Sequence, residues 1–284
     1  MKVIWNNKIV DHEEVVINPE DRGYQFGDGV YEVIRAYNHI YFCLDEHINR
    51  LYSSANKIEL TIPYSKEEIK TLANQLLKES NISTGDLYLQ ITRGISSPRN
   101  HTYPDVAVLP SLTGKANEII RNTEKLTNGI KTSIEEDIRW LRCDIKMISL
   151  LGNIMLKHEA HKKGAEEAIL HREGIITEGS SSNVGIVKDG VIYTHPDSHF
   201  ILPGITKLVL KRCAHALGIP MSEESFTLDD LKEADEVFCT STTLEIMPVN
   251  QVDNWTYSVT DDSIVRRLQR AYEKEIEKQC GPLL

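Results

Sequence analysis

Short apolar strands joined by tight turns recur along the chain, and this pattern limits the fold more than any other feature. The segments "VIWNNKIV", "EAILHREGIITEG" and "NVGIVKDGVIYTH" each place Asn-Asn, Glu-Gly or Asp-Gly between two apolar runs, as β-hairpins do. Helical patterns are found among these hairpins. The mixture of many hairpins with helices predicts an α+β fold rather than a doubly wound parallel sheet.

Several segments carry helix signals. A helix is expected over 65–80, because Ser65 and Glu68 have the spacing of a capping box. Asp45 is expected to cap the helix before it, which covers 46–58. The remaining expected helices run from Ser149 as cap to Gly164, from Thr206 as cap to Gly218, and over 262–279 as an amphipathic helix.

The stretch 113–129, "TGKANEIIRNTEKLTNG", differs in composition from the segments before it: it is polar and rich in Gly and Asn. We interpret it as a linker with edge structure between two domains, a number that a chain of 284 residues favours. The predicted domains are residues 1–118 and 119–284. Further strands are expected over 31–37, 39–44, 85–94 and 105–112, and in "IKTSIEEDIRW" and "RCDIK".

Charge and composition exclude several classes of function. The formal net charge of −10 argues against a nucleic-acid partner, because a phosphate backbone requires a basic face. No apolar run approaches the length of a membrane span, and the N-terminus lacks the apolar core of a signal peptide. The five cysteines are scattered without a CxxC pair, so we expect no metal site, no disulfide framework and a cytoplasmic protein.

A single lysine interrupts the apolar stretch "CDIKMISLLGN". Lys146 could extend its methylenes along the core and leave its charge in water. Alternatively, burial could lower its pKa and supply a neutral amine for chemistry on a carbonyl group. This stretch alone leaves both interpretations open.

Three stretches could bind the charged parts of a ligand. In "TEGSSSN", Glu178 could pair with a protonated ring nitrogen, although turns of this composition are common. In "LPGITK", a helix begins after a glycine, and a helix N-terminus can bind phosphate through its free N–H groups. In "TSTTLE", Thr242 and its neighbours could donate hydroxyl groups to the same anion, or form an ordinary turn.

Two further stretches could face a cleft. Tyr31 begins a strand after "RGYQFGDGV", where its phenol could point into a cleft or pack in the core. In "SPRNHTYP", Arg99 and His101 project to the same side of an extended backbone. Two such donors can clamp a carboxylate, although cations on loops are usually solvated.

Taken in order, seven segments closely resemble the bacterial D-amino acid aminotransferases, a family of the fold-type IV pyridoxal phosphate enzymes. They are "RGYQFGDGVYEV", "DEHINRLYSSA", "TRGISSPRNH", "EDIRWLRCDIK", "TEGSSSNV", "LPGIT" and "TSTTLEIMPV". The resemblance spans the whole chain. It implies a smaller N-terminal α/β sandwich and a larger C-terminal β-barrel-like domain with helices.

The resemblance also implies roles for individual residues. Lys146 matches the lysine that binds pyridoxal 5'-phosphate covalently, and Glu178 matches the carboxylate beside the pyridine nitrogen. The residues that match ligands of the phosphate are Arg50, Ile205, Thr206 and Thr242. Arg139 and His47 are expected to support the residues that bind the ligand rather than to bind it themselves.

The substrate α-carboxylate is expected to meet Tyr31, Arg99 and His101. In the family, the arginine and histidine come from the neighbouring subunit, which implies a homodimer with shared active sites. This chain is one residue longer than the family pattern around 95–98, just ahead of Arg99.

The implied reaction transfers the amino group of D-alanine or another D-amino acid to 2-oxoglutarate, giving pyruvate and D-glutamate. Lys146 would move the Cα proton as a general base, and Glu178 would keep the ring nitrogen protonated. A branched-chain L-amino acid aminotransferase and an aminodeoxychorismate lyase of the same fold remain as alternatives. A cofactor-free enzyme that forms a Schiff base with its substrate is the alternative from a different class.

Overall fold

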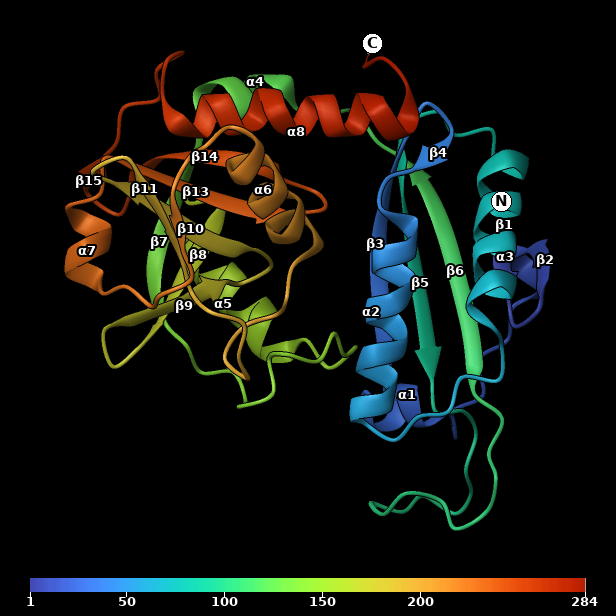
Figure 1. Ribbon diagram of the computed structural model, residues 1–284. Helices are drawn as coiled ribbons and strands as arrows, with labels where there is room; N and C mark the ends of the chain where they lie inside the picture. The colour runs from blue at the N-terminus through green and yellow to red at the C-terminus, as the bar shows by residue number, and fades with distance from the viewer. Residues whose placement is uncertain (284) are drawn as a thin grey trace. The chain divides into compact units, whose positions relative to one another are not determined.

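The computed structural model describes residues 1–283, which form two compact units (Figure 1). Unit 1 comprises Met1–Ile120, Ile145–Ser149 and the chain from Lys278 onward, and unit 2 comprises Arg121–Asp144 and Leu150–Glu277. The short segment that carries Lys146 therefore packs with unit 1, although its neighbours in the sequence belong to unit 2. The predicted division into domains at residue 118 stays a prediction.

Unit 1 is built on an antiparallel sheet whose strand order is β2-β1-β6-β5-β3-β4. The strands are β1 (Lys2–Trp5), β2 (Lys8–Asp11), β3 (Gly29–Tyr37), β4 (Ile40–Tyr41), β5 (Gly85–Thr92) and β6 (Ser111–Glu118). The helices are η1 (His12–Glu14), α1 (Arg22–Phe26), α2 (Leu44–Lys57) and α3 (Lys66–Glu79). Helix α2 packs on β3, and α3 packs on β1 and β6.

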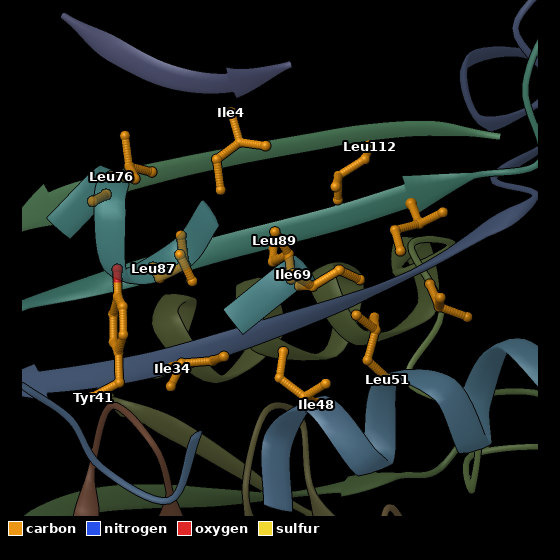
Figure 2. Close-up of a cluster of buried hydrophobic side chains, with 14 of the residues drawn as sticks. Ile4, Ile34, Tyr41, Ile48, Leu51, Ile69, Leu76, Leu87, Leu89 and Leu112 are labelled. Carbon is orange, nitrogen blue, oxygen red and sulfur yellow. The ribbon is translucent and has the colours of Figure 1, made fainter. Parts of the chain in front are cut away.

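The core of unit 1 lies between one face of this sheet and the two long helices (Figure 2). Leu87, Leu89 and Ile91 alternate along β5 and are each 0% exposed, as their spacing predicts. Ile69 and Leu76 meet them from α3. Each such side chain stabilises the fold by about 1.5–3 kcal/mol when fully buried.

Unit 2 is built on a mixed, curled sheet with the order β12-β11-β10-β13-β14-β7-β8-β9, with β15 paired to β14. Its strands are β7 (Ile130–Glu136), β8 (Glu167–Arg172), β9 (Ile175–Gly179), β10 (Asn183–Lys188), β11 (Val191–Thr194), β12 (Met221–Ser222), β13 (Glu236–Ser241), β14 (Glu245–Val252) and β15 (Trp255–Thr256). Strand β7 runs parallel to β8 and β14, and β11 runs parallel to β12. The expected α+β class is confirmed.

The helices α4 (Thr123–Asn128), α5 (Leu151–Lys162), α6 (Ile205–Ala216) and α7 (Leu228–Lys232) lie in unit 2. The C-terminal helix α8 (Ile264–Cys280) begins there, and its last residues are grouped with unit 1. Within residues 1–283, no helix has both the length and the apolar character needed to cross a membrane.

The local signals in the sequence predicted several elements correctly. Ser65 and Glu68 form the expected capping box at α3, with Ser65 Oγ accepting from the Glu68 N–H at 3.2 Å. The hairpin β8–β9 turns at Glu173 and Gly174, whose φ angles are 50° and 83°. These are the left-handed conformations that a two-residue hairpin turn requires.

Three predicted helix starts were wrong. Helix α2 begins at Leu44 after Cys43, so Asp45 lies in the first turn, where its carboxylate favours the positive end of the helix dipole. Helix α5 begins at Leu151, because Ser149 packs with unit 1 against Gly27. The cap of α6 is Gly204 rather than Thr206, which lies within the first turn.

The interpretation of 113–129 as linker with edge structure was wrong for 113–118 and 123–128, which form regular elements. Strand β6 lies inside the sheet between β1 and β5, and α4 follows it. Strand β6 was missed because most of its side chains are polar. Within β6, Leu112 and Ala116 are the residues that point a buried apolar side chain into the core. The predicted strand over 105–112 begins only at Ser111, and "RCDIK" forms no strand.

Candidate active site

Lys146 is held by backbone hydrogen bonds within unit 1. Its carbonyl oxygen accepts from the Tyr31 N–H at 3.0 Å, and its own N–H donates to Ser54 Oγ at 3.2 Å. Ile145 is 4% exposed and packs in the core of unit 1, which holds the Lys146 segment in place. The Lys146 Nζ lies 4.3 Å from the centre of the Tyr31 ring. The structure thus fixes a partly buried amine beside a phenol.

Tyr31 lies on the face of β3 that points away from the helices. Its ring stacks on Tyr88 of β5, with 5.5 Å between the ring centres. Burial raises the pKa of Tyr88 to about 12, and its hydroxyl donates to Gln90 Oε1 at 2.7 Å. The stacking fixes the plane of the Tyr31 ring next to Lys146.

Arg50 is oriented by a carboxylate that the sequence argument missed. Glu32 is 0% exposed, and its two oxygens accept from Arg50 Nε at 2.7 Å and Nη2 at 2.8 Å. The Nδ1 atom of His47 lies 2.8 Å from Glu32 Oε2. Burial raises the pKa of Glu32, but Arg50 and His47 outweigh it and hold that pKa at about 2. Burial lowers the pKa of His47.

Arg99 and His101 lie together in the loop after β5, as their spacing predicts. Arg99 Nη1 is 3.3 Å from His101 Nε2, and both side chains are exposed. Both contact the ring of Phe26, with Arg99 Cζ 4.3 Å from its centre and the imidazole ring centre at 5.7 Å. Arg22, which is 4% exposed, donates from Nη1 to the Asn100 carbonyl at 2.8 Å. Helix α1 therefore supports the loop.

Glu178 lies at the end of β9 in unit 2 and is 4% exposed. Its Oε1 accepts from Arg139 Nη1 at 2.6 Å, and its Oε2 accepts from Asn183 Nδ2 and the Leu202 N–H, each at 3.0 Å. Asp137 also binds the guanidinium of Arg139, accepting hydrogen bonds from Nε and Nη2 at 2.9 Å each. Burial raises the pKa of Glu178 to about 7, although Arg139 opposes the shift. A nearby cation would favour its ionised form.

The N-terminus of α6 lies next to this carboxylate. Gly204 caps the helix without any side-chain hydrogen bond, and Ile205 and Thr206 in the first turn are buried. A Cβ on Gly204 would lie 2.0 Å from Asn183 Oδ1, so a larger residue there would displace the Asn183 side chain. Asn183 thus contacts both Glu178 and the helix cap. The N–H groups of the first turn, with the dipole of a 12-residue helix, suit an anion.

Thr242 lies in the turn between β13 and β14. The register pairs Asn183 of β10 with Thr240 of β13, which brings this turn to the same end of the sheet as Asn183. Within the turn, Ser241 Oγ accepts from the Leu244 N–H at 3.1 Å and lies 3.3 Å from Thr243 Oγ1. The turn offers hydroxyl groups, which can donate to an anion such as phosphate.

Residues 29–252 match the family model described as Amino-transferase class IV. The chain belongs to this family. Its members are pyridoxal phosphate enzymes, so the chain is a pyridoxal phosphate-dependent aminotransferase.

Curated relatives resemble the chain over its full length. The D-alanine aminotransferase of Listeria monocytogenes serotype 4b (strain F2365) is 51% identical over 100% of this chain and 99% of the relative. The D-alanine aminotransferase of Staphylococcus epidermidis (strain ATCC 12228 / FDA PCI 1200) is 47% identical over 97% of this chain and 98% of the relative.

Solved structures share the fold. The branched-chain amino acid aminotransferase of Escherichia coli superposes with a TM-score of 0.89 at 25% identity, over 95% of this chain and 93% of that chain. The branched-chain aminotransferase of the thermophilic archaeon Thermoproteus uzoniensis, solved with norvaline, gives a TM-score of 0.85 at 29% identity, over 99% of this chain and 95% of that chain.

Proposed function

We propose that this aminotransferase moves the amino group of D-alanine or another D-amino acid to 2-oxoglutarate, giving D-glutamate and the 2-oxo acid of the donor, which is pyruvate for D-alanine. The observation that carries this proposal is the full-length similarity to D-alanine aminotransferases, at 45–51% identity. The fixed amine of Lys146 beside Tyr31 fits the chemistry that the reaction requires.

The donor sets fit pyridoxal 5'-phosphate as the cofactor. We assign Lys146 to covalent attachment and Glu178 to the ring nitrogen, since its carboxylate can accept a hydrogen bond from a protonated ring. The residues assigned to the phosphate are Arg50, Ile205, Thr206 and Thr242. When bound, the cofactor supplies an electron sink for the pair of electrons released at the substrate Cα.

The roles of the side chains follow from their chemistry. The amine of Lys146 accepts the Cα proton as a general base and then donates it, at a different carbon, as a general acid. The guanidinium of Arg99, with His101 and the Tyr31 hydroxyl, binds the α-carboxylate. This binding decides which face of Cα meets Lys146, and hence which enantiomer reacts.

We also propose a homodimer, in which Arg99 and His101 serve the active site of the neighbouring subunit. Exposed apolar side chains of unit 2 support this proposal. Leu151, Ile154 and Met155 share one face of α5 by their spacing and are 51–69% exposed, and Trp140 is 48% exposed. A cytoplasmic location remains part of the proposal, since the five cysteines are buried free thiols. The division of the chain into domains 1–118 and 119–284 is likewise part of the proposal.

A substrate assay tests the proposal. The purified enzyme is given 2-oxoglutarate with D-alanine, or with L-alanine, L-leucine or L-valine, and the keto acid product is measured. We expect turnover of the D-isomer to exceed that of every L-isomer by a wide margin. Faster reaction of L-leucine or L-valine would instead indicate a branched-chain L-aminotransferase.

A second assay tests the cofactor separately. The protein is reduced with borohydride and the peptides are analysed by mass spectrometry. We expect a pyridoxyl group on the peptide that contains Lys146. Colourless protein without this adduct would favour the cofactor-free enzyme.

A further inference from the structure

The turn that carries Thr242 ends at a residue in an unusual backbone conformation. Ser241 and Glu245 face each other in the register of β13 and β14, so Thr242–Leu244 form a three-residue hairpin loop. Glu245 follows this loop with a φ of 57°. Residues other than glycine are strained in this left-handed conformation, because their Cβ meets the backbone. A glutamate at this position therefore needs a compensating interaction.

The side chain of Glu245 supplies this interaction. It is 4% exposed, and its oxygens Oε1 and Oε2 accept from Nε and Nη2 of Arg121 at 2.8 and 2.7 Å. Arg121 Nη2 also donates to Glu273 Oε1 of α8 at 2.7 Å. Two parallel hydrogen bonds fix the orientation of both groups as well as their distance. The end of the loop is thus tied to the first residue of unit 2 and to α8.

Backbone strain that persists next to a binding site indicates that the surroundings hold it in place for function. We propose that Glu245 and Arg121 are positioning residues for the cofactor phosphate: they hold the 242–244 loop in the conformation in which Thr242 binds that group. This inference rests on the proposed function of Thr242. Neither side chain touches the phosphate in this scheme, and both act through the loop.

Binding of two related ligands to the apoprotein tests the inference directly. Pyridoxal 5'-phosphate and pyridoxal differ only by the phosphate, and the absorbance of the bound ring reports binding of either one. Glu245→Gly removes the carboxylate but relieves the backbone strain. We expect it to weaken binding of pyridoxal 5'-phosphate by about tenfold, the order of one charge-assisted hydrogen bond, and to leave pyridoxal binding unchanged. Arg121→Met is expected to do the same.

Matched variants separate the possible causes. Glu173→Gly makes the same substitution at another left-handed hairpin position of unit 2, which is exposed, and should change neither affinity. Glu245→Gln keeps the size of the side chain and should fall between the wild type and Glu245→Gly. Thermal unfolding of each apoprotein verifies that it is folded.

The outcomes distinguish this inference from the proposed function. If the wild type binds pyridoxal as tightly as pyridoxal 5'-phosphate, the proposed phosphate site is wrong. If Thr242→Val reduces the preference of the protein for the phosphorylated ligand but Glu245→Gly and Arg121→Met retain it in full, the phosphate site stands and the inference is overturned.

Discussion

Glu178 and Arg139 form a buried ion pair, with 2.6 Å between Glu178 Oε1 and Arg139 Nη1. Although Arg139 lowers the pKa of Glu178, burial raises it to about 7, so this carboxyl can exchange a proton near neutral pH. A protonated pyridine ring would add a second cation at the same carboxylate and favour its ionised form. Burial thus gives Glu178 a pKa at which a nearby cation can shift the carboxyl from its neutral to its ionised form.

Stability of the apoprotein should depend on pH through Glu178. The unfolded carboxyl has a pKa of 4.5 and the folded one of about 7, so between these values the folded protein holds more protons. The contribution of Glu178 to the free energy of unfolding is thus present below pH 4.5 and lost as pH rises through about 7. Urea unfolding should show this as a change of about 3–4 kcal/mol in the difference between the wild type and Glu178→Gln across that window. A constant difference would contradict the raised pKa.

Glu178→Lys should reduce kcat by about 100-fold or more, because a cation beside the ring nitrogen opposes its protonation. Stopped-flow absorbance of the half-reaction with D-alanine measures this step. Glu173→Lys, at an exposed turn, is the control. A normal rate for Glu178→Lys would refute the role assigned to the carboxylate.

Lys146→Ala should lose essentially all turnover, with a reduction of about 1000-fold or more, since the variant lacks the amine that we assign to moving the Cα proton. The variant should still bind pyridoxal 5'-phosphate without a covalent bond, and equilibrium dialysis measures this binding. Lys115→Ala on β6 is a suitable control, because its side chain is exposed. Retained turnover in Lys146→Ala would disprove the assignment.

Phe26→Leu should raise the KM for D-alanine several-fold while changing kcat little. The ring of Phe26 contacts both Arg99 and His101, and a cation on an aromatic face contributes about 0.5–1 kcal/mol at an exposed site. Steady-state kinetics measures both constants. Tyr24→Leu changes an aromatic side chain of the same helix that is 76% exposed, and it should alter neither constant. An equal effect of both variants would indicate a general disturbance of α1.

Glu32→Gln should destabilise the fold at pH 7 by about 3 kcal/mol, because it leaves Arg50 without its buried counter-charge. The pKa of Glu32 is about 2 in the folded protein and 4.5 in the unfolded chain. Its contribution is therefore present above pH 4.5 and lost as pH falls through about 2. Urea unfolding at pH 7 and pH 3 should show the penalty shrinking at the lower pH. Glu118→Gln, on the surface of unit 1, should show no such change.

Local patterns in the sequence predicted what depends on neighbouring residues. The capping box of Ser65 and the hairpin turn at Glu173 involve residues at most three positions apart, and both are present. The start of α5 could not be predicted from Ser149, because that residue packs with a different unit. Strand β6 was missed because its place inside the sheet depends on pairing with distant strands.

In the candidate site, too, the sequence could not predict contacts between residues that lie far apart in the chain. Motif resemblance indicated Lys146 and Glu178, but no local pattern connects Glu178 with Arg139, which lies 39 positions away. Glu32 could have been noticed as a charge at a core-facing position of β3, although its partners lie 15 and 18 positions away. Glu245 gave no signal, since its left-handed backbone is visible only in three dimensions.

The grouping of Ile145–Ser149 with unit 1 limits how this enzyme could be divided or rebuilt. A fragment ending at residue 120 would retain Tyr31 but lose the segment whose carbonyl accepts from the Tyr31 backbone, along with the reactive amine. Joining halves of two related enzymes at residue 120 would combine Lys146 of one enzyme with Tyr31 of the other. Any chimaera of this protein must therefore exchange the 145–149 segment together with β3, as one cassette.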